Sequence, residues 1–169
     1  MFSGKRPRRI EPGPGEESVW DYPRPPMFEA APSKVIRIVC HGVEIARTNQ
    51  CWRMLETSHP PVYYIPISEI QNAELTECAH QSWCEWKGQA SYIDVLIGQE
   101  RVQQAGWFYA NPNPKYKELH RKIAFYPSKI GDCYVNDELV QSQAGDFYGG
   151  WITADIVGPF KGELGTRGW

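Results

Sequence analysis

The segment that decides the fold is residues 89–109, QASYIDVLIGQERVQQAGWFY. Two runs rich in β-branched and aromatic residues, 89–97 and 101–109, flank a short connection at residues 98–100 that contains glycine. Such runs on either side of a glycine-containing turn predict a β-hairpin. We therefore expect this hairpin to form the centre of an antiparallel sheet.

Two further hairpins are predicted, each from two short apolar runs separated by two residues that favour tight turns. The runs and their turns are 35–40 and 43–48 about His41-Gly42, and 134–135 and 139–140 about Asn136-Asp137. Three hairpins in one short chain indicate that most strand pairs are antiparallel.

Single strands are predicted at residues 62–65 and 123–126. Prolines flank the first of them on both sides, so we expect it to lie at a sheet edge or to end early. Helical segments are few and short, with single turns predicted at residues 68–72 and 114–120. The fold class expected is a mainly β, compact antiparallel domain.

The two ends of the chain differ in composition from its middle. Seven of the 14 prolines lie in the first 32 residues, and seven of the 15 glycines lie between Gly145 and Gly168. We divide the chain into an N-terminal arm (1–33), a β-rich core (34–144) and a C-terminal tail (145–169). Both ends carry large aromatic side chains, so we expect them to dock on the core.

Composition and charge exclude several classes of protein. The 169 residues are 41% hydrophobic and 22% charged, which is typical of one globular domain. The net charge of −2 gives no attraction to nucleic acid, and the short basic run of Lys5, Arg6, Arg8 and Arg9 is commonplace in a terminal arm. No apolar stretch is long enough for a membrane span, so we expect no membrane partner and a cytoplasmic location.

The five cysteines do not form a recognisable framework. Their number is odd and their spacing irregular, which indicates reduced thiols in the cytoplasm. Cys78, His80 and Cys84 lie close together, but they lack the tight ligand pairs of a zinc site. We expect neither a metal nor a cofactor.

The densest group of reactive side chains lies in residues 82–92. A thiol, a carboxylate and an amine occur within four residues here. In an extended strand Cys84 and Trp86 would share one face while Glu85 and Lys87 share the other, so the thiol and the charged pair need not converge. The alternative is a structural thiol beside a surface ion pair.

A second candidate is the loop at residues 56–64, which two prolines stiffen before two tyrosines. A rigid loop can present His59 to a pocket at little entropic cost. A tight turn in which the backbone satisfies His59 is an equal alternative.

Five segments resemble a known family. They are LETSHPPVYY (55–64), CEWKGQASY (84–92), AGWFY (105–109), IAFY (123–126) and the tail DFYGGWITADIVGPFKGELGTRGW (146–169). In this order they resemble domain-of-unknown-function family 427 and, through the tail, its longer bacterial members. Glu85 stands where many members have proline.

The resemblance implies a compact, tent-like β fold in which two sheets meet at an angle. Some classifications label the family nucleotidyltransferase-like. The paired acidic motif that would hold catalytic magnesium is absent from this sequence, so the label implies no mechanism here.

The leading functional hypothesis is recognition of a small polar or nucleotide-like ligand in an aromatic-lined pocket, with Lys87 supplying charge to an anion. The expected pocket residues are His59, Tyr63, Cys84, Trp86, Lys87, Tyr92 and Trp107. One alternative is an enzyme, a nucleotidyl transferase among the options, with Cys84 as nucleophile or Lys87 as general base and His59 relaying protons. The other is a protein-interaction module that uses exposed tryptophans and the glycine-rich tail. The sequence specifies neither the ligand nor the oligomeric state.

Overall fold

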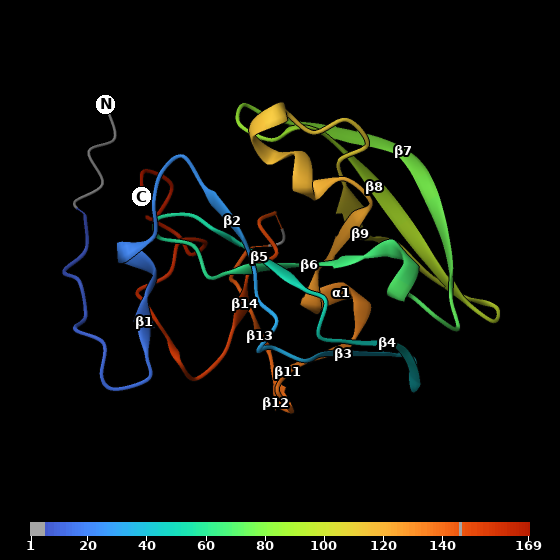
Figure 1. Cartoon of the computed structure of the whole chain (residues 1–169), viewed down its shortest axis with the longest axis horizontal. Helices are drawn as coiled ribbons and strands as arrows, with labels where there is room; N and C mark the ends of the chain where they lie inside the picture. Colours follow the sequence, from blue (N-terminus) through green and yellow to red (C-terminus); the bar gives the residue numbers. More distant parts are fainter. Residues whose placement is uncertain (1–5, 146) are drawn as a thin grey trace.

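In the computed structural model, two antiparallel sheets form most of the fold (Figure 1). Residues 6–145 and 147–169 are described, so Lys5 of the basic run and Asp146 of the tail lie outside the described residues. The large sheet consists, in spatial order, of β2 (Met27–Ala30), β5 (Trp52–Leu55), β6 (Val62–Pro66), β10 (Lys122–Phe125), β9 (Glu100–Phe108), β8 (Gly88–Ile97) and β7 (Glu74–Cys84). The expected mainly β, antiparallel fold class is confirmed.

The smaller sheet contains four strands and two of the predicted hairpins. Its order is β12 (Glu138–Leu139), β11 (Asp132–Val135), β3 (Ile36–Cys40) and β4 (Val43–Thr48). The turn residues have positive φ angles, 47° and 75° at His41 and Gly42 and 49° and 66° at Asn136 and Asp137. Two positive φ angles in succession define the tight turn that matches the twist of a hairpin. The predicted hairpins are confirmed, as is that between β8 and β9.

Short elements complete the chain. The helical segments are η1 (Val19–Asp21), η2 (Ile67–Glu69), η3 (Pro114–Leu119) and α1 (Pro127–Ile130). Two small strand pairs join β1 (Glu17–Ser18) to β15 (Ile156–Val157) in parallel, and β13 (Gln141–Ser142) to β14 (Trp151–Ile152) in antiparallel orientation. Within the described residues, every helix is too short and too polar to span a bilayer.

Sequence patterns did not predict β5 or the long strand β7. β7 lies at the edge of the large sheet, and most of its side chains are exposed. The pattern of alternating apolar and polar residues, which arises when one face is buried, is therefore weak in this segment. In β5 three successive side chains, Arg53, Met54 and Leu55, are all buried, so this strand does not alternate either.

β6 lies inside the large sheet, and the edge position expected from its flanking prolines is wrong. It pairs with β5 on one side and with β10 on the other. Pro60 and Pro61 precede the strand and Pro66 is its last residue, so none of them interrupts the paired interior. The strand, predicted at residues 62–65, extends to Pro66.

The large sheet is covered on both faces. Side chains on one face pack against the small sheet in the main core, which includes Tyr63, Ile123 and Phe125. Their immediate neighbours Tyr64 and Ala124 point to the other face, into a second cluster that η3 covers. This alternation follows from the two-residue period of a strand. It decides which aromatic residues can reach the candidate site.

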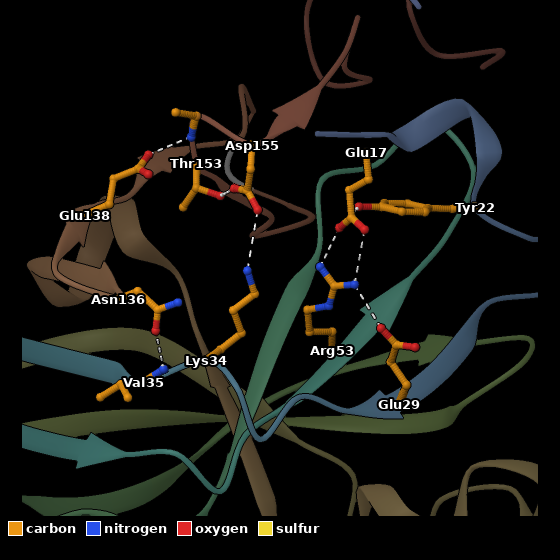
Figure 2. A network of polar contacts seen from close by, with 11 residues as sticks. Glu17, Tyr22, Glu29, Lys34, Val35, Arg53, Asn136, Glu138, Thr153 and Asp155 are labelled. Atoms are coloured by element: carbon orange, nitrogen blue, oxygen red, sulfur yellow. Dashed lines mark hydrogen bonds and ion pairs between the residues drawn. The ribbon is translucent and has the colours of Figure 1, made fainter. Parts of the chain in front are cut away.

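The arm and the tail lie side by side at one end of the molecule (Figure 1). Figure 2 shows the polar contacts of the arm, in which Arg53 binds Glu17 at 2.5 Å and Glu29 at 2.8 Å. Tyr22 donates a hydrogen bond to Glu17 at 2.7 Å. Burial acts against the charge of Arg53, but these two carboxylates outweigh it and raise its pKa. The arm is therefore joined to β5 by an ion-pair network in which Arg53 is buried and the two carboxylates are partly exposed.

The tail contacts the core through both polar and apolar groups. Lys34 lies 3.4 Å from Asp155 (Figure 2). The side chain of Trp151 is 1% exposed, and its indole N–H donates to the carbonyl of Phe125 at 3.1 Å. Its main-chain N–H donates to the carbonyl of Pro61 at 2.8 Å. The tail thus contributes a large side chain to the main core.

Candidate functional site

A cavity of about 370 Å³ opens on the face of the large sheet that points away from the small sheet. Strands β7, β8 and β9 and Tyr126, which follows β10, form one wall, and the β7–β8 turn, the arm, the loop before β6 and the tail form the others. The lining residues are Arg24, Glu56, His59, Ser82, Trp83, Cys84, Trp86, Lys87, Ala90, Tyr92, Trp107, Tyr109, Tyr126, Phe147, Tyr148, Lys161 and Trp169. Six of the seven residues selected from the sequence are among them.

Cys84, Trp86 and Lys87 reach the cavity from the turn between β7 and β8. The expectation of one extended strand through this segment is wrong, because Cys84 ends β7 and pairs directly with Gly88 at the start of β8. Gly88 has a φ of +109°, a conformation that other residues rarely adopt. The reversal brings the thiol and the amine to the same cavity, although strand alternation would have separated them.

The β7–β8 turn is anchored from outside the cavity. The main-chain N–H of Asn113 donates to the carbonyl of Lys87 at 3.0 Å, and its side-chain amide donates to the carbonyl of Trp86 at 2.5 Å. Both bonds use main-chain oxygens of the turn. These bonds fix the backbone from which the side chain of Lys87 extends. The side chain itself makes neither of them.

Tyr63 does not reach the cavity. It packs against Trp151 in the main core, with ring centroids 5.1 Å apart. Its neighbour Tyr64 lies on the cavity side of the sheet, where its hydroxyl accepts a hydrogen bond from the indole N–H of Trp107 at 3.2 Å. Trp107 in turn packs on Tyr126, with centroids 4.5 Å apart. These contacts hold the aromatic wall rigidly in place.

His59 is held by hydrogen bonds that fix its tautomer. The side chain of Gln143 accepts from the N–H of Gly150 at 3.1 Å and donates to the carbonyl of Lys161 at 2.7 Å, which orients the amide. The other N–H of this amide faces Nδ1 of His59 at 3.3 Å, so Nδ1 is the acceptor. The ring proton therefore sits on Nε2, which faces the carboxylate of Glu56 at 3.4 Å.

The cavity carries an excess of positive charge. Arg24, Lys87 and Lys161 line it, whereas Glu56 is the one acidic side chain among the described lining residues. Burial acts to raise the pKa of Glu56, but the hydrogen bond from His59 and the nearby cations outweigh it and lower that pKa. Glu56 is therefore an anion at neutral pH, and it offsets only part of the charge.

Backbone strain occurs beside His59. Ser58 has a φ of +75°, and its side chain is completely buried. Its hydroxyl has no hydrogen-bond partner, and no other buried side-chain N or O atom in the described part of the chain lacks one. Strained residues and unpaired polar groups concentrate at functional sites, where the surrounding structure holds them in place.

The suggested zinc ligands do not form a cluster. His80 packs on Tyr92 with ring centroids 4.7 Å apart, while Cys84 lines the cavity. Residues 6–145 and 147–169 contain no group of three His, Cys, Asp or Glu side chains arranged to bind a metal.

Sequence reasoning did not select Arg24, Glu56 and Lys161. Glu56 could have been found, because it lies three residues before His59 in a loop already expected to be rigid. No sequence motif marks Arg24 or Lys161 as a site residue, because they lie in the arm and the tail, far from the two candidate segments. Their positions depend on contacts between segments far apart in the sequence.

Comparison with known proteins identifies a family profile over the middle of the chain. A profile described as a domain of unknown function (DUF427), with the short name NTP_transf_9, matches residues 28–136. A search of curated proteins finds no match. The matched segment includes His59, Cys84 and Lys87, but it begins after Arg24 and ends before Lys161. One part of the cavity wall therefore lies inside the matched domain, and the arm and tail supply the rest.

Proposed function

The chain belongs to the DUF427 family, a domain of unknown function, and we propose that its cavity binds a small anionic molecule that carries a planar ring. The observation that supports this proposal is the charge balance of the side chains that line the cavity, in which Arg24, Lys87 and Lys161 outnumber Glu56. The volume of about 370 Å³ lies within the range of roughly 300 to 1,000 Å³ that is usual for small-molecule sites.

Lys87 is the cation best placed to bind the anionic group. It is partly buried, and none of the described Asp or Glu carboxylates lies within 4.0 Å of its amine. Glu56 instead faces Arg24 and His59, each at 3.4 Å. A partly buried ammonium group with no carboxylate in direct contact favours an anionic ligand.

Aromatic side chains at the rim favour a ring in the ligand. Trp83 is 72% exposed and Phe147 is 64% exposed, and both line the cavity. Large apolar side chains are normally buried unless they form a binding surface. Flat rings at the mouth of a cationic cavity can stack on a planar ligand while the amine of Lys87 binds its anionic end.

The hydrogen bonds of His59 favour binding over catalysis. Its Nδ1 accepts from Gln143 and its Nε2 faces Glu56, so both ring nitrogens already have partners. A general base needs a free nitrogen directed at the group that it deprotonates. In this arrangement His59 fixes the wall of the cavity.

An enzymatic function is the second candidate, because Cys84, Lys87 and His59 line the same cavity. In it Cys84 would act as nucleophile or Lys87 as general base. The rate of alkylation by iodoacetamide tests the first role. A catalytic thiol would react much faster below neutral pH than a model thiol, and a structural thiol would not.

We also propose a cytoplasmic location. All five cysteines are free thiols, and Cys40, Cys51 and Cys133 are buried. Burial raises the pKa of Cys51 to about 11, which keeps it in the unreactive thiol form. Several unpaired cysteines in one domain are typical of a reducing compartment.

Thermal-shift measurements with AMP and adenosine test the proposed binding, since the two probes share a ring system and differ in the phosphate. At a concentration 100 times the dissociation constant, AMP should stabilise the protein by about 2.7 kcal/mol and raise Tm by about 5 to 10 °C. Adenosine should give a much smaller shift. Lys87→Met should weaken AMP binding at least about tenfold, as expected for the loss of a charge-assisted hydrogen bond.

Lys117→Met is the matched control, because Lys117 is exposed on η3 and lies outside the cavity. It removes the same charge and should leave the AMP shift unchanged. Equal AMP binding by wild type and Lys87→Met would contradict the proposal, as would an equal response to AMP and adenosine.

A further inference from the structure

A second cavity of about 330 Å³ adjoins the first. Its lining residues are Arg6, Trp20, Arg24, Thr57, Gly168 and Trp169. Arg24 and Trp169 line both cavities, so these two side chains lie between the two spaces. A ligand longer than the first cavity can therefore extend past Arg24 into the second.

Arg24 is positioned by two contacts of its guanidinium group. One of its terminal nitrogens donates to the carbonyl of Thr57 at 2.7 Å and lies 3.4 Å from Glu56. A guanidinium group has five N–H donors in a fixed plane, so these contacts leave donors for a ligand. Arg24 can thus bind an anionic group where the two cavities meet.

Arg6 supplies the second cation of this cavity. Its guanidinium lies over the ring of Trp20, 5.3 Å from the centroid. Trp20 is itself fixed, because its indole N–H donates to the carbonyl of Pro159 at 2.9 Å and its ring packs edge-on against Trp169 at 5.5 Å. A cation over an immobilised aromatic ring has a defined position.

Arg6 differs from Arg9, another arginine of the basic run, in its ion pairs. Arg9 pairs with Glu11 at 2.5 Å and with Asp21 at 2.7 Å, so its charge is already balanced. Among the described residues that line the second cavity there are two arginines and no acidic side chain. Glu56 lies 3.4 Å from Arg24, whereas no described Asp or Glu side chain pairs with Arg6, and two guanidinium groups facing one space favour an anion there.

We infer that the second cavity is an anion subsite of the same binding site, so that the ligand is a planar-ring compound with two linked anionic groups, the chemistry of a nucleoside diphosphate. This inference rests on the proposed function. The ring and the first anionic group occupy the first cavity near Lys87, and the second anionic group lies between Arg24 and Arg6.

Isothermal titration calorimetry with AMP and ADP tests this inference on the full chain. Wild type should bind ADP about tenfold more tightly than AMP, because the second phosphate gains charge-assisted hydrogen bonds. Arg6→Gln should remove this gain and leave AMP affinity unchanged. Arg8→Gln, the same change at an exposed position of the arm outside the cavity, should keep the gain.

The outcomes separate this inference from the proposed function. If AMP binds through Lys87 but ADP binds no tighter, or if Arg6→Gln keeps the full gain, the second subsite is refuted and the proposed function stands. If neither nucleotide binds, or if Lys87→Met binds AMP as well as wild type does, the proposed function fails and the second subsite fails with it.

Discussion

Replacement of Gln143 by leucine should destabilise the protein strongly. Gln143 is 4% exposed, and its side chain connects the loop before β6 to two separate parts of the tail. It accepts from Gly150, donates to the carbonyl of Lys161 and donates to Nδ1 of His59. Leucine has a similar volume but can make none of these bonds, so three polar groups lose a partner.

The magnitude follows from counting those groups. A buried polar group left without a partner costs about 1 to 3 kcal/mol. At the lower end the three groups together cost about 3 kcal/mol. In a domain of this size each kcal/mol lowers Tm by about 2 to 4 °C, so Gln143→Leu should lower Tm by about 6 to 12 °C.

Thermal unfolding followed by circular dichroism measures this loss. Gln141→Leu is the control, because Gln141 lies in β13 two residues before Gln143, is exposed, and pairs with Ile152 through the main chain. Nitrogen-15 NMR provides a second readout, since wild-type His59 should show the proton on Nε2. A Tm loss no larger than that of Gln141→Leu, or a proton on Nδ1 of His59, would refute the reasoning.

Three further predictions concern stability. Ser58→Gly should raise stability by about 1 kcal/mol in urea unfolding, because it relieves a positive φ angle and removes an unpaired hydroxyl; an unchanged midpoint would count against that strain. Gly106→Ala should lower the free energy of unfolding by about 2 to 3 kcal/mol in the same assay, because an added Cβ would overlap the carbonyl oxygen of Ala124. An unchanged free energy of unfolding would mean that β9 and β10 move apart to accommodate the Cβ. The pKa of Glu56 lies below its ordinary value of 4.5, so Glu56 stabilises the fold at neutral pH and this contribution is lost as the pH falls below about 4.5. Glu56→Gln should therefore lose less stability than wild type between pH 7 and pH 3 in thermal unfolding, and parallel curves would contradict this.

Local sequence signals predicted the hairpins because their turns are decided by a few adjacent residues. His41-Gly42 and Asn136-Asp137 are residue types that tolerate positive φ angles, and they occur between runs of strand-forming residues. β7 escaped prediction because an edge strand with mostly exposed side chains shows no apolar alternation.

The candidate site was harder to predict, because the sheet is buried on both faces. Tyr63 and Tyr64 are both buried, 3% and 1% exposed, so alternation of polarity cannot show which of them faces the cavity. At residues 84–88 the chain reverses and does not continue as one extended strand. Gly88 permits this reversal, but the neighbouring residues give no sign of it. Lys87 lies in the β7–β8 turn and His59 in the loop before β6, and strands far apart in the sequence must pair in one sheet before the two residues can line the same cavity.

The residues that hold the fold and those that would bind a ligand are largely separate. Arg53 joins the arm to β5 through Glu17 and Glu29, and none of these three side chains lines the cavity. The turn that carries Lys87 is anchored through main-chain oxygens, and Arg6 is exposed on the arm. Substitution of either cation should therefore leave the fold intact, so that a loss of binding can be attributed to the ligand contact itself. Gln143 is the exception, because it both fixes His59 in the cavity wall and joins the tail to the core, and this is why its loss should affect stability first.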